Sequence, residues 1–176
     1  MIPNSLKLSG FLSYREPVAI DFTSFDLAAI SGSNGAGKSS LLDAITWSLF
    51  GQARRRDDAV IHNGMDAAEV VFDFEYEGQL YRVQRTKPRN KTTILEFFIY
   101  GDQGWRALTE HSLRETEARI QQTLRLDYDT FTNASFFLQG KADQFAQQRP
   151  SDRKRILGNI LGLEVWDTYR EEDSNR

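Results

Sequence analysis

The sequence predicts an α/β fold, because an apolar strand, a glycine-rich loop and a helix follow one another and a series of alternating strands comes after them. The apolar run 27–30 leads into the glycine-rich stretch 32–37, and apolar residues recur at helical spacing over 42–49. Polar and apolar residues then alternate over 69–77, as in strands that bury one face. We therefore expect a strand–loop–helix core under a mixed sheet, with an antiparallel β subdomain over about 69–108.

The composition is that of a folded chain without a membrane span. Of the 176 residues, 40% are hydrophobic and 27% are charged, which is typical of globular rather than disordered proteins. The absence of cysteine excludes disulfides and thiolate metal sites and favours a reducing compartment. No apolar run approaches the roughly 18 residues of a membrane span, and the N-terminus lacks the features of a signal peptide. A net charge of −3 by itself argues against general affinity for nucleic acid.

The first two expected strands form a hairpin that precedes the glycine-rich loop. Residues 5–11 and 18–22 alternate in polarity, and 13–17 can supply the turn between them. The run 27–30 is apolar throughout, which predicts a strand covered on both faces. The helix after the loop should end at Gly51, which stands where a C-cap is expected.

The remaining strands belong to the β subdomain, and helices follow them. Strands are expected over 69–77, 80–85, 92–100 and 105–108. Ser112 and Glu115 have the spacing of a capping box, so a helix should begin there. Further helices are expected from Pro150 and from Leu163.

The glycine-rich loop matches the phosphate-loop pattern G-x-x-x-x-G-K-[ST] at every fixed position from Gly32 to Ser39. Glycines let successive backbone N–H groups converge on a phosphate, and the helix N-terminus adds a positive partial charge. Lys38 would reach the β- and γ-phosphates as a catalytic cation, and the Ser39 hydroxyl would hold Mg²⁺. The predicted nucleotide-binding residues are Gly32, Ser33, Asn34, Gly35, Ala36, Gly37, Lys38, Ser39 and Ser40.

The sequence lacks a clear second carboxylate for the metal ion of such a site. Phosphate-loop NTPases place this carboxylate at the end of a buried strand. The nearest match is Asp73, but the alternation of its strand puts it on the polar face, which favours a structural role. His62 is an unlikely metal ligand, because only His111 could partner it. The chain therefore carries half of the catalytic apparatus of a phosphate-loop NTPase.

Four segments together resemble the N-terminal ATPase lobe of the SbcC family of DNA-repair ATPases, which are relatives of the SMC proteins. These segments are 10–15, 34–51, 137–143 and 153–164. The resemblance implies a P-loop ABC-type ATPase head of which residues 1–162 form the N-terminal lobe, with the antiparallel β subdomain at about 69–108. Residues 163–176 would then begin a coiled-coil helix.

The resemblance also implies roles for particular residues. Gln139 would contact the metal ion or the attacking water as a catalytic group, and Ile61 and His62 would pack beside the adenine. Some members have a phosphate-contacting Arg where this chain has Leu12, and whether Arg15 replaces it is open. The family's signature motif, Mg-linked Asp, catalytic Glu and switch His lie in its C-terminal lobe. This chain should therefore bind ATP and Mg²⁺ but hydrolyse little ATP alone.

The implied partners follow from the split head of the family. They are the C-terminal lobe of the same protein, a second copy of the head in an ATP-dependent dimer, an SbcD-type nuclease and double-stranded DNA, with no membrane. We expect a cytoplasmic, nucleoid-associated protein that processes DNA ends. The alternative is an SMC-like structural chromosome ATPase without a nuclease partner, and a less favoured third interpretation is the nucleotide-binding component of an ABC transporter.

A basic stretch modifies the inference from net charge. Between Arg82 and Lys91 there are five basic residues and no acidic one, and Pro88 and Asn90 predict a turn. We expect these cations to crowd the tip of a hairpin. Two interpretations of them are nearly equal: they belong to a solvated loop, or they contact the phosphates of DNA. The candidate DNA contacts are Arg85, Lys87, Arg89 and Lys91.

Overall fold

The computed structural model describes residues 1–25, 27, 29–135 and 149. The chain forms two compact units, Met1–Leu124 and Arg125–Arg176. Three predictions fall outside the described residues: the catalytic role of Gln139, the helix from Pro150 and the coiled-coil start at 163–176. The sheet and the candidate site lie in the first unit.

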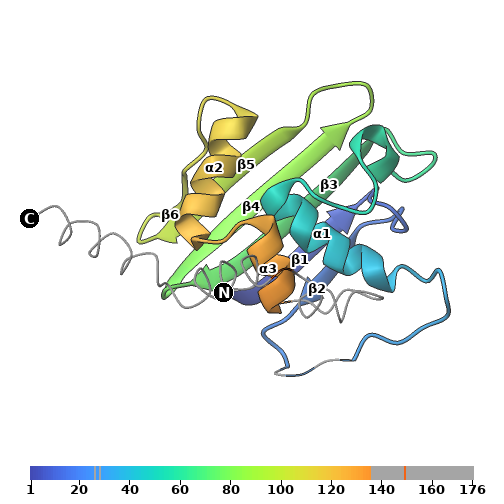
Figure 1. Cartoon of the computed structure of the whole chain (residues 1–176), viewed down its shortest axis with the longest axis horizontal. Coiled ribbons are helices and arrows are strands. Elements are labelled where there is room, and N and C mark those ends of the chain that lie inside the picture. Colours follow the sequence, from blue (N-terminus) through green and yellow to red (C-terminus); the bar gives the residue numbers. More distant parts are fainter. Residues whose placement is uncertain (26, 28, 136–148, 150–176) are drawn as a thin grey trace, which may run out of the picture. The chain divides into compact units, whose positions relative to one another are not determined.

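A single six-stranded sheet forms the centre of the first unit (Figure 1). Its strands are β1 (Ile2–Ser9), β2 (Val18–Asp21), β3 (Ala67–Tyr76), β4 (Gln79–Pro88), β5 (Ile94–Gly101) and β6 (Gly104–Ala107). They lie in the order β2-β1-β3-β4-β5-β6, and every pair of neighbours is antiparallel. The predicted hairpin and the predicted strands of the β subdomain are confirmed, but they belong to one continuous sheet. The expected mixed sheet is wrong for the residues that the structure describes.

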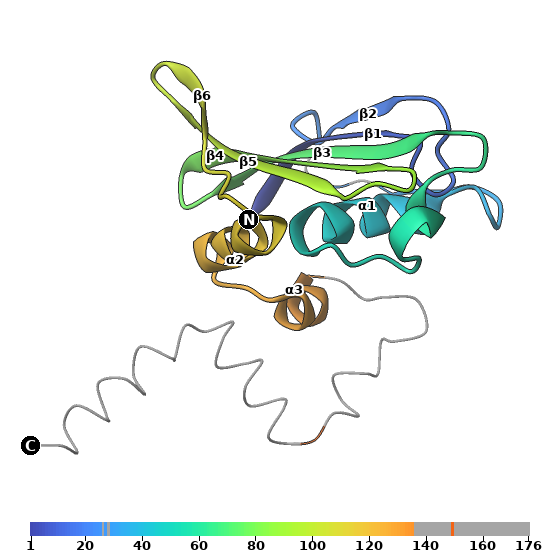
Figure 2. The same ribbon diagram turned by 90° about the horizontal axis from the view of Figure 1, so that it is seen from above.

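Helices α1 (Lys38–Phe50) and α2 (Leu113–Leu124) lie on the same face of this sheet (Figure 2). Residues spaced by two along β1, β3, β4 and β5 face the helices and are buried, which is the result of the polar–apolar alternation. The fully buried side chains of these strands include Leu6, Val70, Phe72, Phe74, Val83 and Phe97. The other face carries the polar positions of the same strands.

The ends of both helices follow the sequence signals. Gly51 ends α1 in the left-handed region with φ 68°, and its N–H donates to the Trp47 carbonyl at 2.9 Å. At the start of α2 the Ser112 hydroxyl donates to the Glu115 carboxylate at 2.9 Å and accepts from the Glu115 N–H at 3.2 Å. The bond from the Glu115 N–H is the N-cap half of the predicted capping box, whereas the Glu115 carboxylate binds the Ser112 hydroxyl.

Asp73 has the structural role predicted for it. Both of its carboxylate oxygens accept hydrogen bonds from Arg82, at 2.7 and 2.8 Å, and the Ser5 hydroxyl donates to it at 3.1 Å. The Arg82 guanidinium also lies 4.3 Å from the centroid of the Trp105 ring. Asp73 thus joins three strands of the sheet and is fully engaged in doing so.

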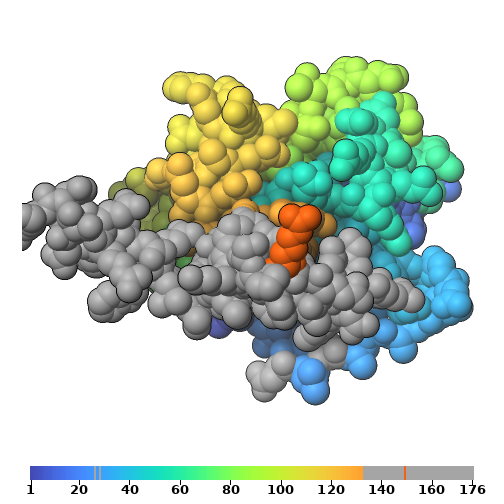
Figure 3. Space-filling model, in the orientation of Figure 1, coloured from blue at the N-terminus to red at the C-terminus, as the bar shows by residue number. Residues whose placement is uncertain are grey.

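The expected strand at 27–30 is wrong for the described residues of that segment. Leu27 is 92% exposed and Ile30 is 55% exposed, and neither is assigned to a strand. A strand that is apolar on both faces needs pairing strands beside it and covering layers above and below. The described residues supply neither, and the light-blue atoms of this part of the chain lie at the lower right edge of the view in Figure 3.

The second unit is described over residues 125–135 and at residue 149. There α3 spans Tyr128–Ser135, and Asp127 caps it by accepting the Thr130 N–H at 2.7 Å. Among the described residues, no helix has the length and apolar character needed to cross a membrane.

Candidate nucleotide site

The phosphate loop leads directly into the N-terminus of α1. Gly37, the residue before the helix, has φ 91°, and a Cβ added to it would lie 3.2 Å from Ser13 Cβ and from a Tyr14 ring carbon. Only glycine combines this left-handed conformation with so close a neighbour. The first turn of the chain therefore packs against the point where the loop becomes helix.

Lys38 lies over the opening of the loop. Its ammonium donates hydrogen bonds to the carbonyl oxygens of Gly32 and Ser33 at 2.7 and 2.9 Å. Ser39 is exposed at the start of α1, where its hydroxyl is accessible to a metal ion. Ser40 is fully buried, and its hydroxyl is shared with Ser13 at 3.2 Å. The geometry thus brings the loop, the lysine and Ser39 together as the phosphate-loop pattern predicts, whereas the Ser40 hydroxyl is engaged within the protein.

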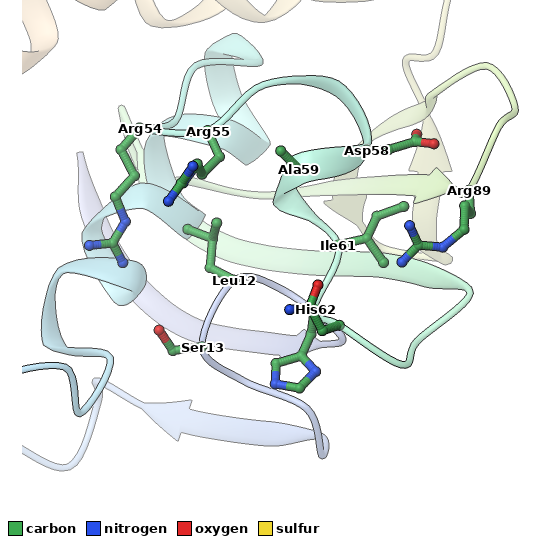
Figure 4. Close-up of a pocket in the computed structure, with 10 residues that line it drawn as sticks. Leu12, Ser13, Arg54, Arg55, Asp58, Ala59, Ile61, His62 and Arg89 are labelled. Carbon is green, nitrogen blue, oxygen red and sulfur yellow. The ribbon is translucent and has the colours of Figure 1, made fainter.

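A cavity of about 740 Å³ lies beside the first turn of the chain (Figure 4), and Ser13, which lines it, also lies against Gly37 at the end of the phosphate loop. Its lining includes Leu12, Ser13, Arg54, Ile61, His62 and Arg89. The volume falls within the range of about 300–1,000 Å³ that is usual for small-molecule sites. Ile61 and His62, the residues predicted to lie beside adenine, both line the cavity, although their contact with a base stays a prediction.

Backbone hydrogen bonds hold this wall of the cavity to the first turn of the chain. The Leu12 N–H donates to the Val60 carbonyl at 2.8 Å, and the His62 N–H donates to the Gly10 carbonyl at 2.7 Å. Phe11, between them, is fully buried. His62 Nδ1 is buried and has no hydrogen-bond partner among the described residues. The wall of the cavity therefore holds one buried ring nitrogen that no described residue pairs with.

Arg54 is the cation that the sequence interpretation missed. Its guanidinium donates to the Ser40 hydroxyl and pairs with the Asp43 carboxylate at 2.8 Å, and its own N–H donates to Asp43 at 3.2 Å. Burial raises the pKa of Asp43, while Arg54 acts in the opposite direction. Arg54 is also a better candidate than Arg15 for the phosphate-contacting arginine that some family members have at the position of Leu12. The Arg15 side chain is 65% exposed and lies 3.7 Å from Glu16, whereas Arg54 lines the cavity.

The position of Arg54 shortly after the end of α1 is the sequence feature that could have indicated its place beside the helix. It follows the Gly51 cap by three residues, so the chain that leaves α1 passes back along the helix beside Asp43. In the sequence, the two acids that follow the three arginines at 54–56 conceal this role, because they balance much of the charge of the run.

The basic stretch does not crowd the tip of the hairpin as predicted. Arg82 and Arg85 are three residues apart on β4 and therefore point to opposite faces of the sheet. Arg85 is 2% exposed and donates to Glu117 at 2.8 Å and to the Ser48 carbonyl at 3.2 Å. Its predicted contact with DNA is wrong, because a phosphate cannot reach a buried and paired guanidinium. Lys87, Arg89 and Lys91 keep their predicted role as an expectation, although Lys87 pairs with Asp58 at 2.9 Å.

The fold and the loop define a phosphate-loop nucleotide-binding domain, with Lys38 bound to the loop carbonyls at the start of α1. Comparison with protein families gives a matching result, since the family described as "AAA domain" matches residues 5–172. The chain belongs to this family.

Two DNA-repair proteins are similar to this chain over nearly its whole length. The SbcC component of the SbcCD nuclease of Deinococcus radiodurans is 35% identical over 169 residues, which is 93% of this chain and 19% of that protein. A probable DNA double-strand break repair Rad50 ATPase of Aquifex aeolicus is 35% identical over 176 residues, which is 97% of this chain and 18% of that protein. The predicted resemblance to the N-terminal ATPase lobe of the SbcC family is confirmed. The chain spans less than one fifth of the length of these two relatives.

A solved structure agrees with this fold class. The SMC head domain from Thermotoga maritima superposes with a TM-score of 0.50 and 27% sequence identity, over 68% of this chain and 42% of that chain. The predicted α/β ABC-type ATPase head with its antiparallel strands is therefore confirmed as the fold class.

Proposed function

We propose that this chain is the ATP-binding N-terminal lobe of a split ATPase head that acts in DNA double-strand-break repair. The observation that carries the proposal is the phosphate loop, in which Lys38 donates to the loop carbonyls at the start of α1. A cavity of about 740 Å³ is connected to it through Ser13, which lines the cavity and lies against Gly37. The names of its relatives, a nuclease component and a repair ATPase, support the role in repair. They also support a nuclease of the SbcD type and double-stranded DNA as partners, and we propose a second copy of the head as a further partner.

The residues present fit ATP with Mg²⁺. Loop N–H groups and Lys38 would hold the β- and γ-phosphates, and Ser39 would hold the metal ion. Ile61 and His62 would pack beside the adenine, because both residues line the cavity. Bound Mg²⁺ would supply neutralising charge at the phosphates.

Two features of the described residues support an ATPase head that is divided into two lobes. Both carboxylate oxygens of Asp73 already accept hydrogen bonds, from Arg82 and Ser5. The described residues contain no group of three or more His, Cys, Asp or Glu side chains placed for a metal ion. The exposed apolar residues Leu27 and Ile30 precede the phosphate loop. We infer that strands of the C-terminal lobe cover this segment, since pairing would bury its apolar side chains and satisfy its backbone groups.

Titration calorimetry with Mg-ATP tests the nucleotide assignment on this chain. Binding of Mg-ATP that is tighter than binding of AMP or adenosine is expected, because the loop and Lys38 act on the terminal phosphates. Equal affinity for all three ligands, or no binding of any, would reject the assignment.

Replacing Arg54 with glutamine should weaken Mg-ATP binding about tenfold, because a charge-assisted hydrogen bond contributes about 1.5–3 kcal/mol. Arg54 is the cation fixed beside the loop by Ser40 and Asp43. Arg56→Gln removes the same charge from the same exposed run and serves as the matched control. If both variants lose affinity equally, the effect reflects general charge and Arg54 has no specific place in the site.

A further inference from the structure

Asp58 lies where the wall of the cavity meets the turn between β4 and β5. It belongs to the short 3₁₀ helix η1 (Asp57–Val60) and lines the cavity. One of its carboxylate oxygens pairs with Lys87 Nζ at 2.9 Å, and the other accepts the Asn90 N–H at 2.9 Å. Both oxygens of this one side chain are therefore bound to the strand end and turn that carry the remaining basic residues.

Two further contacts fasten the same turn, which we define as residues 89–91 and call the basic turn. The Arg89 N–H donates to the Asp66 carbonyl at 2.8 Å, and its guanidinium donates to the Met65 carbonyl at 2.9 Å. Lys87, near the end of β4, also donates from Nζ to the Lys91 carbonyl of the turn. These contacts with Asp58, Met65 and Asp66 all fall in 58–66, the segment that also contributes Ile61 and His62 to the cavity.

Arg89 belongs to both features at once. Figure 4 shows Arg89 and Asp58 on one side of the cavity, with Arg54 and Arg55 on the other side. A nucleotide whose base packs beside Ile61 would lie in the same cavity as Arg89 and Asp58, where it can change the contacts of both side chains. The hydrogen bond from Lys87 is the largest of the influences that lower the pKa of Asp58, so its carboxylate stays charged at neutral pH.

We propose that Asp58 is a positioning residue that couples the nucleotide cavity to the basic turn, so that bound nucleotide changes the affinity of the turn for a polyanion such as duplex DNA. The proposal rests on the proposed function, because it takes the cavity as the nucleotide site. The coupling is reciprocal, since each ligand must change the affinity of the other by the same factor. One oxygen of Asp58 binds Lys87 and the other binds the Asn90 N–H. A variant that removes only the charge should therefore weaken the contact with Lys87, whereas a variant that removes the whole side chain should lose both contacts.

The test measures the dissociation constant of a short blunt duplex for the chain, with and without saturating Mg-ATP. The ratio of the two dissociation constants is the coupling factor. Each variant is saturated with Mg-ATP, so a change in its affinity for Mg-ATP does not alter the coupling factor. We expect a ratio of about fivefold or more for the unaltered chain and a ratio near one for Asp58→Ala. Asp57→Ala, which changes the neighbouring exposed acid, should keep the original ratio.

Amide hydrogen exchange supplies a readout of the attachment itself. The Asn90 amide should exchange at least about tenfold faster in Asp58→Ala than in Asp57→Ala, because its acceptor is gone. Asp58→Asn keeps an acceptor oxygen and should restore slow exchange, while the coupling that depends on the charge stays reduced.

The outcomes separate the two proposals. If the chain does not bind Mg-ATP, the proposed function fails and the coupling fails with it. If the chain binds both ligands and Asp58→Ala keeps the coupling factor, only the role of Asp58 is overturned. A ratio of one in the unaltered chain, with both ligands bound, overturns it as well.

Discussion

Replacing Lys38 with alanine is expected to weaken Mg-ATP binding by more than about a hundredfold. The ammonium lies 2.7 and 2.9 Å from two carbonyls at the opening of the phosphate loop, where it can transfer its hydrogen bonds to the β- and γ-phosphates. Two charge-assisted hydrogen bonds of about 1.5 kcal/mol or more each correspond to this loss of affinity. Titration calorimetry of the variant measures it directly.

The control for this variant is Lys7→Ala, which removes an exposed lysine from β1. Both variants should keep the thermal unfolding temperature of the parent chain, since neither lysine lies in the core. Binding of Mg-ATP by Lys38→Ala with parental affinity would mean that the glycine-rich loop is not the phosphate site.

Replacing Arg85 with alanine is expected to lower the free energy of unfolding by about 3 kcal/mol or more, as is typical when one partner of a buried ion pair is removed. Arg85 joins three elements, since it donates from β4 to the Ser48 carbonyl near the end of α1 and to Glu117 of α2. Its guanidinium also lies 5.8 Å from the Trp47 ring centroid. Denaturant unfolding followed by circular dichroism measures the loss.

Two comparisons distinguish this structural role from a role in DNA binding. Arg85→Lys keeps a charge but loses the forked geometry, so it should recover part of the stability. The double variant with Glu117→Gln should lose less than the sum of the single changes, because the two side chains are partners. A stable Arg85→Ala chain with reduced duplex affinity would contradict the structure.

Local patterns in the sequence were sufficient to predict most of the sheet and both helices beside it. The alternation over 69–77 predicts β3 because side chains of a strand with one buried face must follow a period of two. Ser112 predicts the start of α2 because its hydroxyl and the Glu115 carboxylate satisfy local backbone and side-chain groups. The phosphate loop is equally local, since its function requires particular residues at fixed spacing.

Features that depend on distant partners could not be predicted in the same way. The run 27–30 has the composition of a buried strand, but a strand forms only where other strands can pair with it. Arg85 has the sequence context of a surface cation because its partner, Glu117, is 32 residues away. Arg54 became a candidate for the site only when the structure placed it beside Asp43 and Ser40.

The most direct test of the split ATP site measures ATP turnover by this 176-residue chain alone and after addition of the C-terminal lobe of the same protein. Turnover is followed as phosphate release with Mg-ATP, and Lys38→Ala serves as the inactive control. The account predicts that the chain alone binds Mg-ATP but releases little phosphate, and that adding the C-terminal lobe raises turnover. Brisk hydrolysis by the chain alone, abolished by Lys38→Ala, would contradict it.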